Sequence, residues 1–155
     1  MTDSKIQEVL AIFAPLLGEK VWEPKLGHGS FITLEFGKAL PSKEVRGRTY
    51  THGEWHLWIY MCVWRLEKGR EVLATSEDSH SKIESAIQCL DGLALSSVEL
   101  TSPNWETIFR FEQEIVIRTF SAYPNDEEDE AYWMLFTPSG NVLSVGSGEK
   151  WIYES

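Results

Sequence analysis

The sequence has few cysteines, no long apolar run and no motif of a redox or zinc-binding protein. Its two cysteines, Cys62 and Cys89, do not form a Cys-x-x-Cys pair, which excludes a zinc knuckle and a thioredoxin-like motif. No apolar stretch approaches the roughly 20 residues that a membrane-spanning helix needs, and the polar first residues do not resemble a signal peptide. We therefore expect a cytoplasmic protein that folds without disulfides and has no membrane partner.

Basic residues are also scarce. The chain has 24 acidic residues against 14 basic ones, which gives a net charge of −10. Phosphate backbones repel such a surface, so a nucleic-acid partner is not expected. The same charge attracts a basic protein and speeds its encounter, or it only keeps the protein soluble.

The length and composition are those of one globular domain. A chain of 155 residues with 43% hydrophobic residues can bury a sizeable core as a single domain over residues 1–155. The seven tryptophans are the unusual feature, because each large ring needs burial or a partner.

Periodicity predicts two helices and many strands. Apolar residues at helical spacing indicate helices over Asp3–Phe13 and Ser81–Leu90. In Ser30–Phe36 the residues alternate between an apolar and a mixed face, which is typical of a half-buried strand. Glu54–Leu66 is apolar on both faces, so we predict that it is one central strand covered on both sides.

The order of these elements repeats. Each half of the chain begins with a helix and a glycine turn, continues through a charged loop, and ends with a tryptophan-rich strand and its returning partner. We therefore predict two pseudo-repeats, over about 1–78 and 79–155, each with one helix and about four antiparallel strands. The expected fold is α+β, with a large curved antiparallel sheet and two helices on one face.

The predicted central strand carries an aromatic face, from which we take the candidate binding residues Trp58, Tyr60 and Trp64. Three interpretations stay open for this face. Tryptophan and tyrosine dominate binding hot spots, which favours a groove or an interface. The same rings on a central strand also suit a core or a self-complementary homodimer contact.

Two charged loops supply the other candidate binding residues. Arg46 and Arg48 can hold an anionic ligand or pair with the protein's own acids. Asp126, Glu127 and Glu128 belong to an acidic run that suits a solvated loop or a docking surface for a basic partner. The run lacks the alternating ligands and central glycine of a calcium-binding EF-hand loop.

The segment His52-Gly-Glu-Trp-His56 has the histidine spacing of a metal motif, but only for a helix. At the start of a strand four residues span about 13 Å, which is too far for one metal ion. We therefore predict no metal site. No nucleophile elbow and no other catalytic motif is present, which favours a protein without enzymatic activity and without a cofactor.

The second half resembles a group of small uncharacterised bacterial proteins, some of which look like immunity proteins of polymorphic toxin systems. The resemblance covers about residues 83–153. It rests on strand and turn segments, which are Leu90-Asp91-Gly92, Ser97-Val98-Glu99-Leu100, Ile108-Phe109-Arg110-Phe111, Ile117-Arg118-Thr119-Phe120 and Trp133-Met134-Leu135-Phe136-Thr137-Pro138-Ser139-Gly140. It implies a non-enzymatic protein that neutralises a toxin by binding, and it supplies no catalytic residues.

Three function classes follow from the sequence. The first is a binding protein, such as an immunity-like inhibitor of a basic toxin, as the charge and the resemblance imply. The second is a small-ligand-binding protein or enzyme with a pocket between sheet and helices. The third is a homodimeric structural module built on the aromatic face.

Overall fold

The computed structural model describes residues 4–121, 131–146 and 149–155. In these residues the chain forms two α-helices, α1 (Ser4–Phe13) and α2 (His80–Ala86), each followed by a short 3₁₀ turn, η1 (Ala14–Leu16) and η2 (Ile87–Leu90). The strands of the first half are β1 (Val21–Leu26), β2 (Ile32–Ala39), β3 (Lys43–Val45), β4 (Arg48–Tyr50), β5 (Gly53–Ile59), β6 (Val63–Lys68) and β7 (Glu71–Thr75). Those of the second half are β8 (Leu95–Thr101), β9 (Glu106–Phe111), β10 (Ile115–Phe120), β11 (Ala131–Phe136), β12 (Val142–Gly146) and β13 (Lys150–Glu154).

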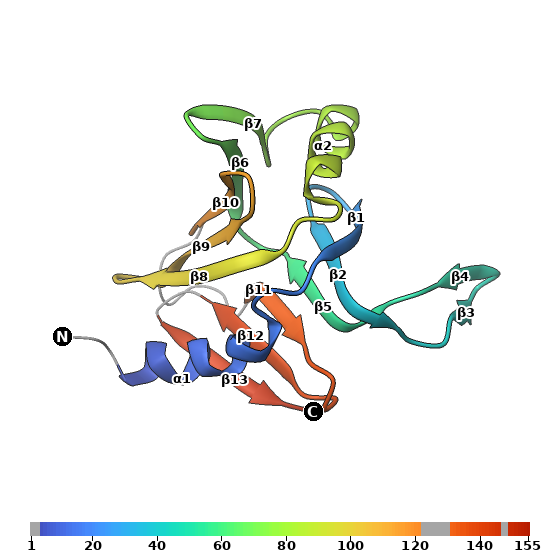
Figure 1. Ribbon diagram of the computed structural model, residues 1–155, viewed down its shortest axis with the longest axis horizontal. Helices are drawn as coiled ribbons and strands as arrows, with labels where there is room; N and C mark the ends of the chain where they lie inside the picture. Colours follow the sequence, from blue (N-terminus) through green and yellow to red (C-terminus); the bar gives the residue numbers. More distant parts are fainter. Residues whose placement is uncertain (1–3, 122–130, 147–148) are drawn as a thin grey trace.

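The strands form two antiparallel sheets and one separate hairpin (Figure 1). The six-stranded sheet has the order β1-β2-β5-β11-β12-β13, and the five-stranded sheet has the order β7-β6-β10-β9-β8. The predicted α+β class, with two helices and extensive antiparallel sheet, is confirmed. The strands form two sheets, however, and not the one large sheet that was predicted. Each sheet contains strands from both halves of the chain.

The predicted single strand over Glu54–Leu66 is wrong. Its first part is β5 of the six-stranded sheet and its second part is β6 of the five-stranded sheet. Between them, the backbone N–H of Tyr60 donates to the carbonyl of Tyr132 at 2.7 Å, after which the chain crosses to the other sheet. The apolar residues on both faces belong to two strands with different surroundings, and periodicity within one segment does not mark such a crossing.

The core lies where the inner faces of the two sheets and the helices meet. On β2 the alternation is as predicted, because Ile32, Leu34 and Phe36 are fully buried. The ring of Phe13 at the end of α1 packs 6.2 Å from that of Phe109 on β9 and 5.3 Å from that of Trp133 on β11, measured between centroids. One helix thus joins strands of both sheets through a single aromatic cluster.

The helices form close to where they were predicted, and they lie apart from each other rather than side by side on one face (Figure 1). Helix α1 contacts β8, whereas α2 contacts β7 and β1. Ser79 caps α2 by accepting a hydrogen bond from the backbone N–H of Lys82. No helix among the described residues is both long and apolar enough to cross a membrane.

The β3–β4 hairpin projects from the ends of β2 and β5 (Figure 1), next to a β-bulge between these two strands. The register of β2 on β5 shifts between Phe36 and Ala39, where Gly37 has a φ of +75°. A Cβ atom on Gly53 would lie 2.3 Å from the carbonyl oxygen of Phe36, so only glycine permits this approach of β5 to β2. The hairpin extends from this bulge and is exposed along both strands.

Candidate functional site

A cavity of about 610 Å³ lies on the outer face of the six-stranded sheet, next to the base of the hairpin. β2 and β5 supply its floor, because the residues that alternate with their buried core residues point to this face. Its apolar wall consists of Leu26, Leu40, Tyr50, Trp58 and Phe136. Its polar side chains are those of Lys25, Thr33, Glu35, Thr51, His52, Glu54, His56 and Thr137. The volume is that of a site for a small molecule.

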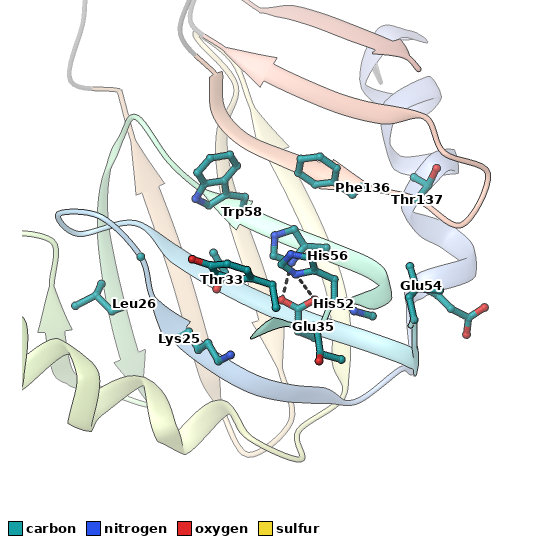
Figure 2. Close-up of a pocket in the computed structure, with 15 residues that line it drawn as sticks. Lys25, Leu26, Thr33, Glu35, His52, Glu54, His56, Trp58, Phe136 and Thr137 are labelled. Carbon is teal, nitrogen blue, oxygen red and sulfur yellow. Dashed lines mark hydrogen bonds and ion pairs between the residues drawn. The ribbon is translucent and has the colours of Figure 1, made fainter. Parts of the chain in front are cut away.

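The polar centre of the cavity is a carboxylate between two imidazoles (Figure 2). Glu35 on β2 is only 3% exposed. Its Oε2 lies 2.6 Å from Nδ1 of His56, and its Oε1 lies 3.5 Å from Nδ1 of His52. Oε1 also accepts a 2.8 Å hydrogen bond from the backbone N–H of Gly53. A buried carboxylate is thus held by two side chains and one backbone group.

These contacts keep Glu35 ionised. Burial acts to raise the pKa of its carboxyl group, but the hydrogen bond and electrostatic attraction from His56, the Gly53 N–H and the attraction from His52 hold that pKa below its ordinary value. An ionised carboxylate only accepts hydrogen bonds, so Nδ1 of His56 carries the donated hydrogen. In a neutral imidazole this leaves Nε2 as a hydrogen-bond acceptor or metal ligand.

The expectation that His52 and His56 are too far apart to act together is wrong. Their ring centroids are 4.5 Å apart. β5 begins only at Gly53, and His52 lies outside the strand, with its carbonyl accepting a 2.8 Å hydrogen bond from the N–H of Leu40. The distance for an extended strand therefore does not apply, and both imidazoles reach the same carboxylate.

Aromatic rings cover one side of this cluster. The ring of Phe136 packs 5.3 Å from that of His56, and the two residues are paired across β11 and β5. Trp58, two residues along β5, lines the same cavity. Its buried indole N–H has no hydrogen-bond acceptor among the described residues. The site thus combines a charged centre with apolar walls.

The structure keeps two of the three aromatic binding candidates together and places the third elsewhere. Trp58 lines the cavity, and the ring of Tyr60, just after β5, packs 4.8 Å from that of Trp58 and 4.4 Å from that of Phe31, measured between centroids. Trp64 is fully buried on β6 and donates a 2.8 Å hydrogen bond from Nε1 to the carbonyl of Ser30. The aromatic face is therefore not continuous, and Trp64 belongs to the core.

Neither of the two arginine candidates lines the cavity. Arg46 lies in the turn of the β3–β4 hairpin and Arg48 begins β4, and both are exposed. Asp126, Glu127 and Glu128 lie outside the described residues.

Sequence reasoning missed Glu35, although the alternation of Ser30–Phe36 placed it opposite the apolar face. The missing information was the register that pairs Glu35 with His56. A buried acid on one strand and a histidine on another become a recognisable pair only when their strands are known to be neighbours.

Comparison with protein-family models, with curated proteins and with solved structures finds no match to this chain. The functional argument therefore depends on the site itself.

Proposed function

We propose that the protein binds a small, largely apolar molecule in this cavity, with one polar group of the molecule directed at Glu35 and its two histidines. The observation that carries the proposal is a buried carboxylate, held by His56 and the Gly53 N–H, at the floor of a cavity of about 610 Å³ with aromatic walls. Ligand sites usually combine a concave apolar lining with a few converging polar groups. Of the three function classes, this observation favours the small-ligand class. The predicted place of its pocket is wrong, however, because the cavity lies on the outer face of the six-stranded sheet and no residue of α1 or α2 lines it.

The residues of the cavity wall indicate the shape and polarity of the ligand. Trp58 and Phe136 offer ring surfaces, and Leu26 and Leu40 extend the apolar lining. A flat aromatic or alicyclic body suits such a wall, because ring contacts contribute about 0.5–1.5 kcal/mol beyond the burial of area.

The proposal is tested by screening aromatic fragments for thermal stabilisation of the protein and for ligand-observed NMR signals. The informative variant is Phe136→Ala, which removes part of the wall. Its matched control is Phe120→Ala, because Phe120 is also a partly buried phenylalanine at the end of a strand but lies outside the cavity.

We expect fragments that bind the wild-type protein and the Phe120→Ala variant with similar affinity. Binding to Phe136→Ala should be about three- to tenfold weaker, which corresponds to the loss of one aromatic contact. A screen without binders, or binders that do not distinguish the two variants, would refute the proposal.

The inhibitor and homodimer hypotheses stay predictions. The acidic run that suits a basic partner lies outside the described residues. The aromatic face required by the homodimer hypothesis is divided between two sheets, with Trp64 in the core. Salt-dependent capture of one basic protein would support the inhibitor hypothesis, and light scattering of the purified protein would test the dimer.

We also infer that the halves 1–78 and 79–155 are copies of one unit. The support is the sheet order, in which β1-β2-β5 and β6-β7 of the first half correspond to β8-β9-β10 and β11-β12 of the second half. Both halves place three strands in one sheet and the next two in the other. The bridge between Lys20 and Ala94 joins the segments that precede β1 and β8.

A circular permutant tests this inference. It begins at Ser79 and joins residue 155 to residue 1 through a flexible linker. If the halves are equivalent units, their order can be exchanged, and we expect the circular dichroism spectrum and cooperative unfolding of the parent protein. Permutants that stay unfolded with several linker lengths would contradict the inference.

A further inference from the structure

We infer that Glu35, His52 and His56 form a binding site for one divalent transition-metal ion, best represented by Zn²⁺, at the floor of the cavity. Each of the three side chains offers one ligand atom, and these atoms all lie within 4.8 Å of one another. Two imidazoles and one carboxylate are a donor set that proteins use for Zn²⁺ and other first-row metals. Calcium and magnesium are disfavoured, because they prefer oxygen ligands.

The three side chains are already close together in the metal-free protein. Glu35 is fixed by the Gly53 N–H, and Gly53 is itself fixed by its close approach to the backbone of Phe36. His56 is 13% exposed and packs against Phe136, so its ring has little freedom. His52 is 49% exposed and can adjust its ring to complete the site. Two rigid ligands and one adaptable ligand lower the entropy lost on binding.

The charge of the site also favours a cation. The carboxylate of Glu35 is buried, and its hydrogen-bond and ion-pair partners are two imidazoles and one backbone N–H. Zn²⁺ binding would break the 2.6 Å hydrogen bond between His56 and Glu35, because a ligating nitrogen must offer its lone pair. The two groups would then move apart to allow metal–ligand distances of about 2.0–2.2 Å. The overall charge of −10 adds a favourable long-range field for a cation.

Three protein ligands leave at least one coordination position of Zn²⁺ open. The cavity lies directly over the cluster, so this position is available to a bound molecule (Figure 2). If the proposed small-ligand function holds, the metal also specifies the polar group of the ligand. An anionic group such as a carboxylate would coordinate the metal, whereas it would be repelled by Glu35 in the metal-free protein.

The chain supplies its own controls for metal binding. It has four histidines, of which His28 and His80 lie outside the cluster. His80 forms an exposed pair with Glu84, one helical turn away, at 3.6 Å. The His80–Glu84 pair is therefore a control for the weak metal binding that an exposed histidine beside an acid can show.

The experiment uses the full chain, freed of any affinity tag and treated with a chelator. Zn²⁺ content after dialysis is measured by mass spectrometry, affinity by competition with a chromophoric chelator, and ligand geometry by the visible spectrum of Co²⁺. The variants are His52→Ala, His56→Ala, His28→Ala and His80→Ala. Circular dichroism confirms that each is folded, and the exposed His52 gives a variant that keeps the core intact.

We expect one equivalent of Zn²⁺ in the wild-type protein and in the His28→Ala and His80→Ala variants. Affinity should fall at least about tenfold in His52→Ala and in His56→Ala, by analogy with the loss of other coordinating or supporting groups. Zn²⁺ should raise the melting temperature of the wild-type protein and not that of His52→Ala. Absence of binding, or equal binding by His52→Ala and His80→Ala, would overturn the inference.

A matched pair of probes separates this inference from the proposed function. A naphthalene carboxamide and the corresponding carboxylate have the same apolar body. We expect the carboxylate to bind more tightly than the carboxamide with Zn²⁺ present, and the order to reverse without it. Binding of either probe without any effect of Zn²⁺ would support the proposed small-ligand function and refute the metal site. Metal binding without binding of either probe would support the metal site and refute the proposed small-ligand function.

Discussion

The indole Nε1 of Trp133 donates a 2.9 Å hydrogen bond to Oγ1 of Thr107. Trp133 lies on β11 of the six-stranded sheet and Thr107 on β9 of the five-stranded sheet. Both residues are fully buried. A polar contact thus links the two sheets inside an apolar core, where an unpaired donor is costly.

Replacement of Thr107 by valine tests this link. The Thr107→Val variant keeps the shape of the side chain but leaves the Trp133 N–H without its acceptor. We expect the free energy of unfolding to fall by about 1–3 kcal/mol, measured by urea denaturation with circular dichroism. Thr101→Val is the control, because Thr101 is exposed and its hydroxyl donates to the carbonyl of Glu106 at the surface. An equal loss in both variants would show that the buried link has no special role.

Glycine at position 53 controls the edge of the site. In Gly53→Ala the new methyl group would collide with the backbone of Phe36, where no flexible side chain can give way. We expect a loss of at least about 1–3 kcal/mol in the free energy of unfolding. In Gly27→Ala the nearest atoms are at 3.6 Å, an ordinary contact, so the change should stay within about 1 kcal/mol. Thermal unfolding of the two variants distinguishes these outcomes, and similar melting temperatures would contradict the expected collision.

Glu67 should make the stability depend on acid pH. Burial acts to raise the pKa of this carboxyl group, but hydrogen bonds and attraction from Arg65 and Arg118 hold its pKa below the ordinary value. The distances from Glu67 Oε2 are 2.6 Å to Nε of Arg65 and 2.9 Å to Nε of Arg118. Because the folded-state pKa is depressed, the stabilisation is present above the unfolded-state pKa of about 4.3. It is lost as the pH falls through the folded-state value.

The corresponding variant is Glu67→Gln. At neutral pH we expect it to lower the free energy of unfolding by about 1–2 kcal/mol, since it weakens hydrogen bonds to two guanidinium groups. This difference from the wild-type protein should shrink as the pH falls below about 4. Glu99→Gln disrupts an exposed pair with Arg110 and should cost less than about 1 kcal/mol. Urea titrations over a pH series measure both effects, and a Glu67→Gln difference that does not change with pH would be inconsistent with this explanation.

The two cysteines should differ in reactivity. Burial raises the pKa of the Cys62 thiol to about 12, and its sulfur lies 3.5 Å from the carbonyl of Tyr132. Burial also raises the pKa of Cys89, but this residue is exposed. Because the thiolate is the reactive form, iodoacetamide at mildly alkaline pH should label Cys89 much faster than Cys62. Peptide mass spectrometry over time measures the rates. The difference should vanish in denaturant, and equal rates in the native protein would contradict the raised pKa of the partly buried Cys62.

The helices and the buried faces of single strands were predictable from the sequence. Helix α1 follows from the spacing of Ile6, Val9, Leu10 and Phe13, and the fully buried residues of β2 are the ones that alternation selected. These features depend on which side chains lie on one face of one segment. That relationship is contained in the local sequence, since the helical and extended backbones have fixed periods.

The site was only partly predictable. The sequence marked His52 and His56 as a pair and Trp58 as a binding candidate, yet it excluded a metal by treating the histidines as parts of one extended strand. The bulge near Gly53 and the irregular position of His52 change that distance. The third member of the cluster, Glu35, lies on β2, 17 residues before His52, so no local pattern connects it with the histidines.

By itself, the sequence determined the α+β class, the two helices and the inward faces of strands such as β2. Only the tertiary structure decided the crossing between β5 and β6, the division into two sheets, and the register that places Glu35 beside His56. The physical reason is the range of the interactions. Helices and strand faces depend on neighbours in the chain, whereas strand order and register depend on hydrogen bonds and packing between distant segments. The cluster in the cavity is a product of that second kind of contact.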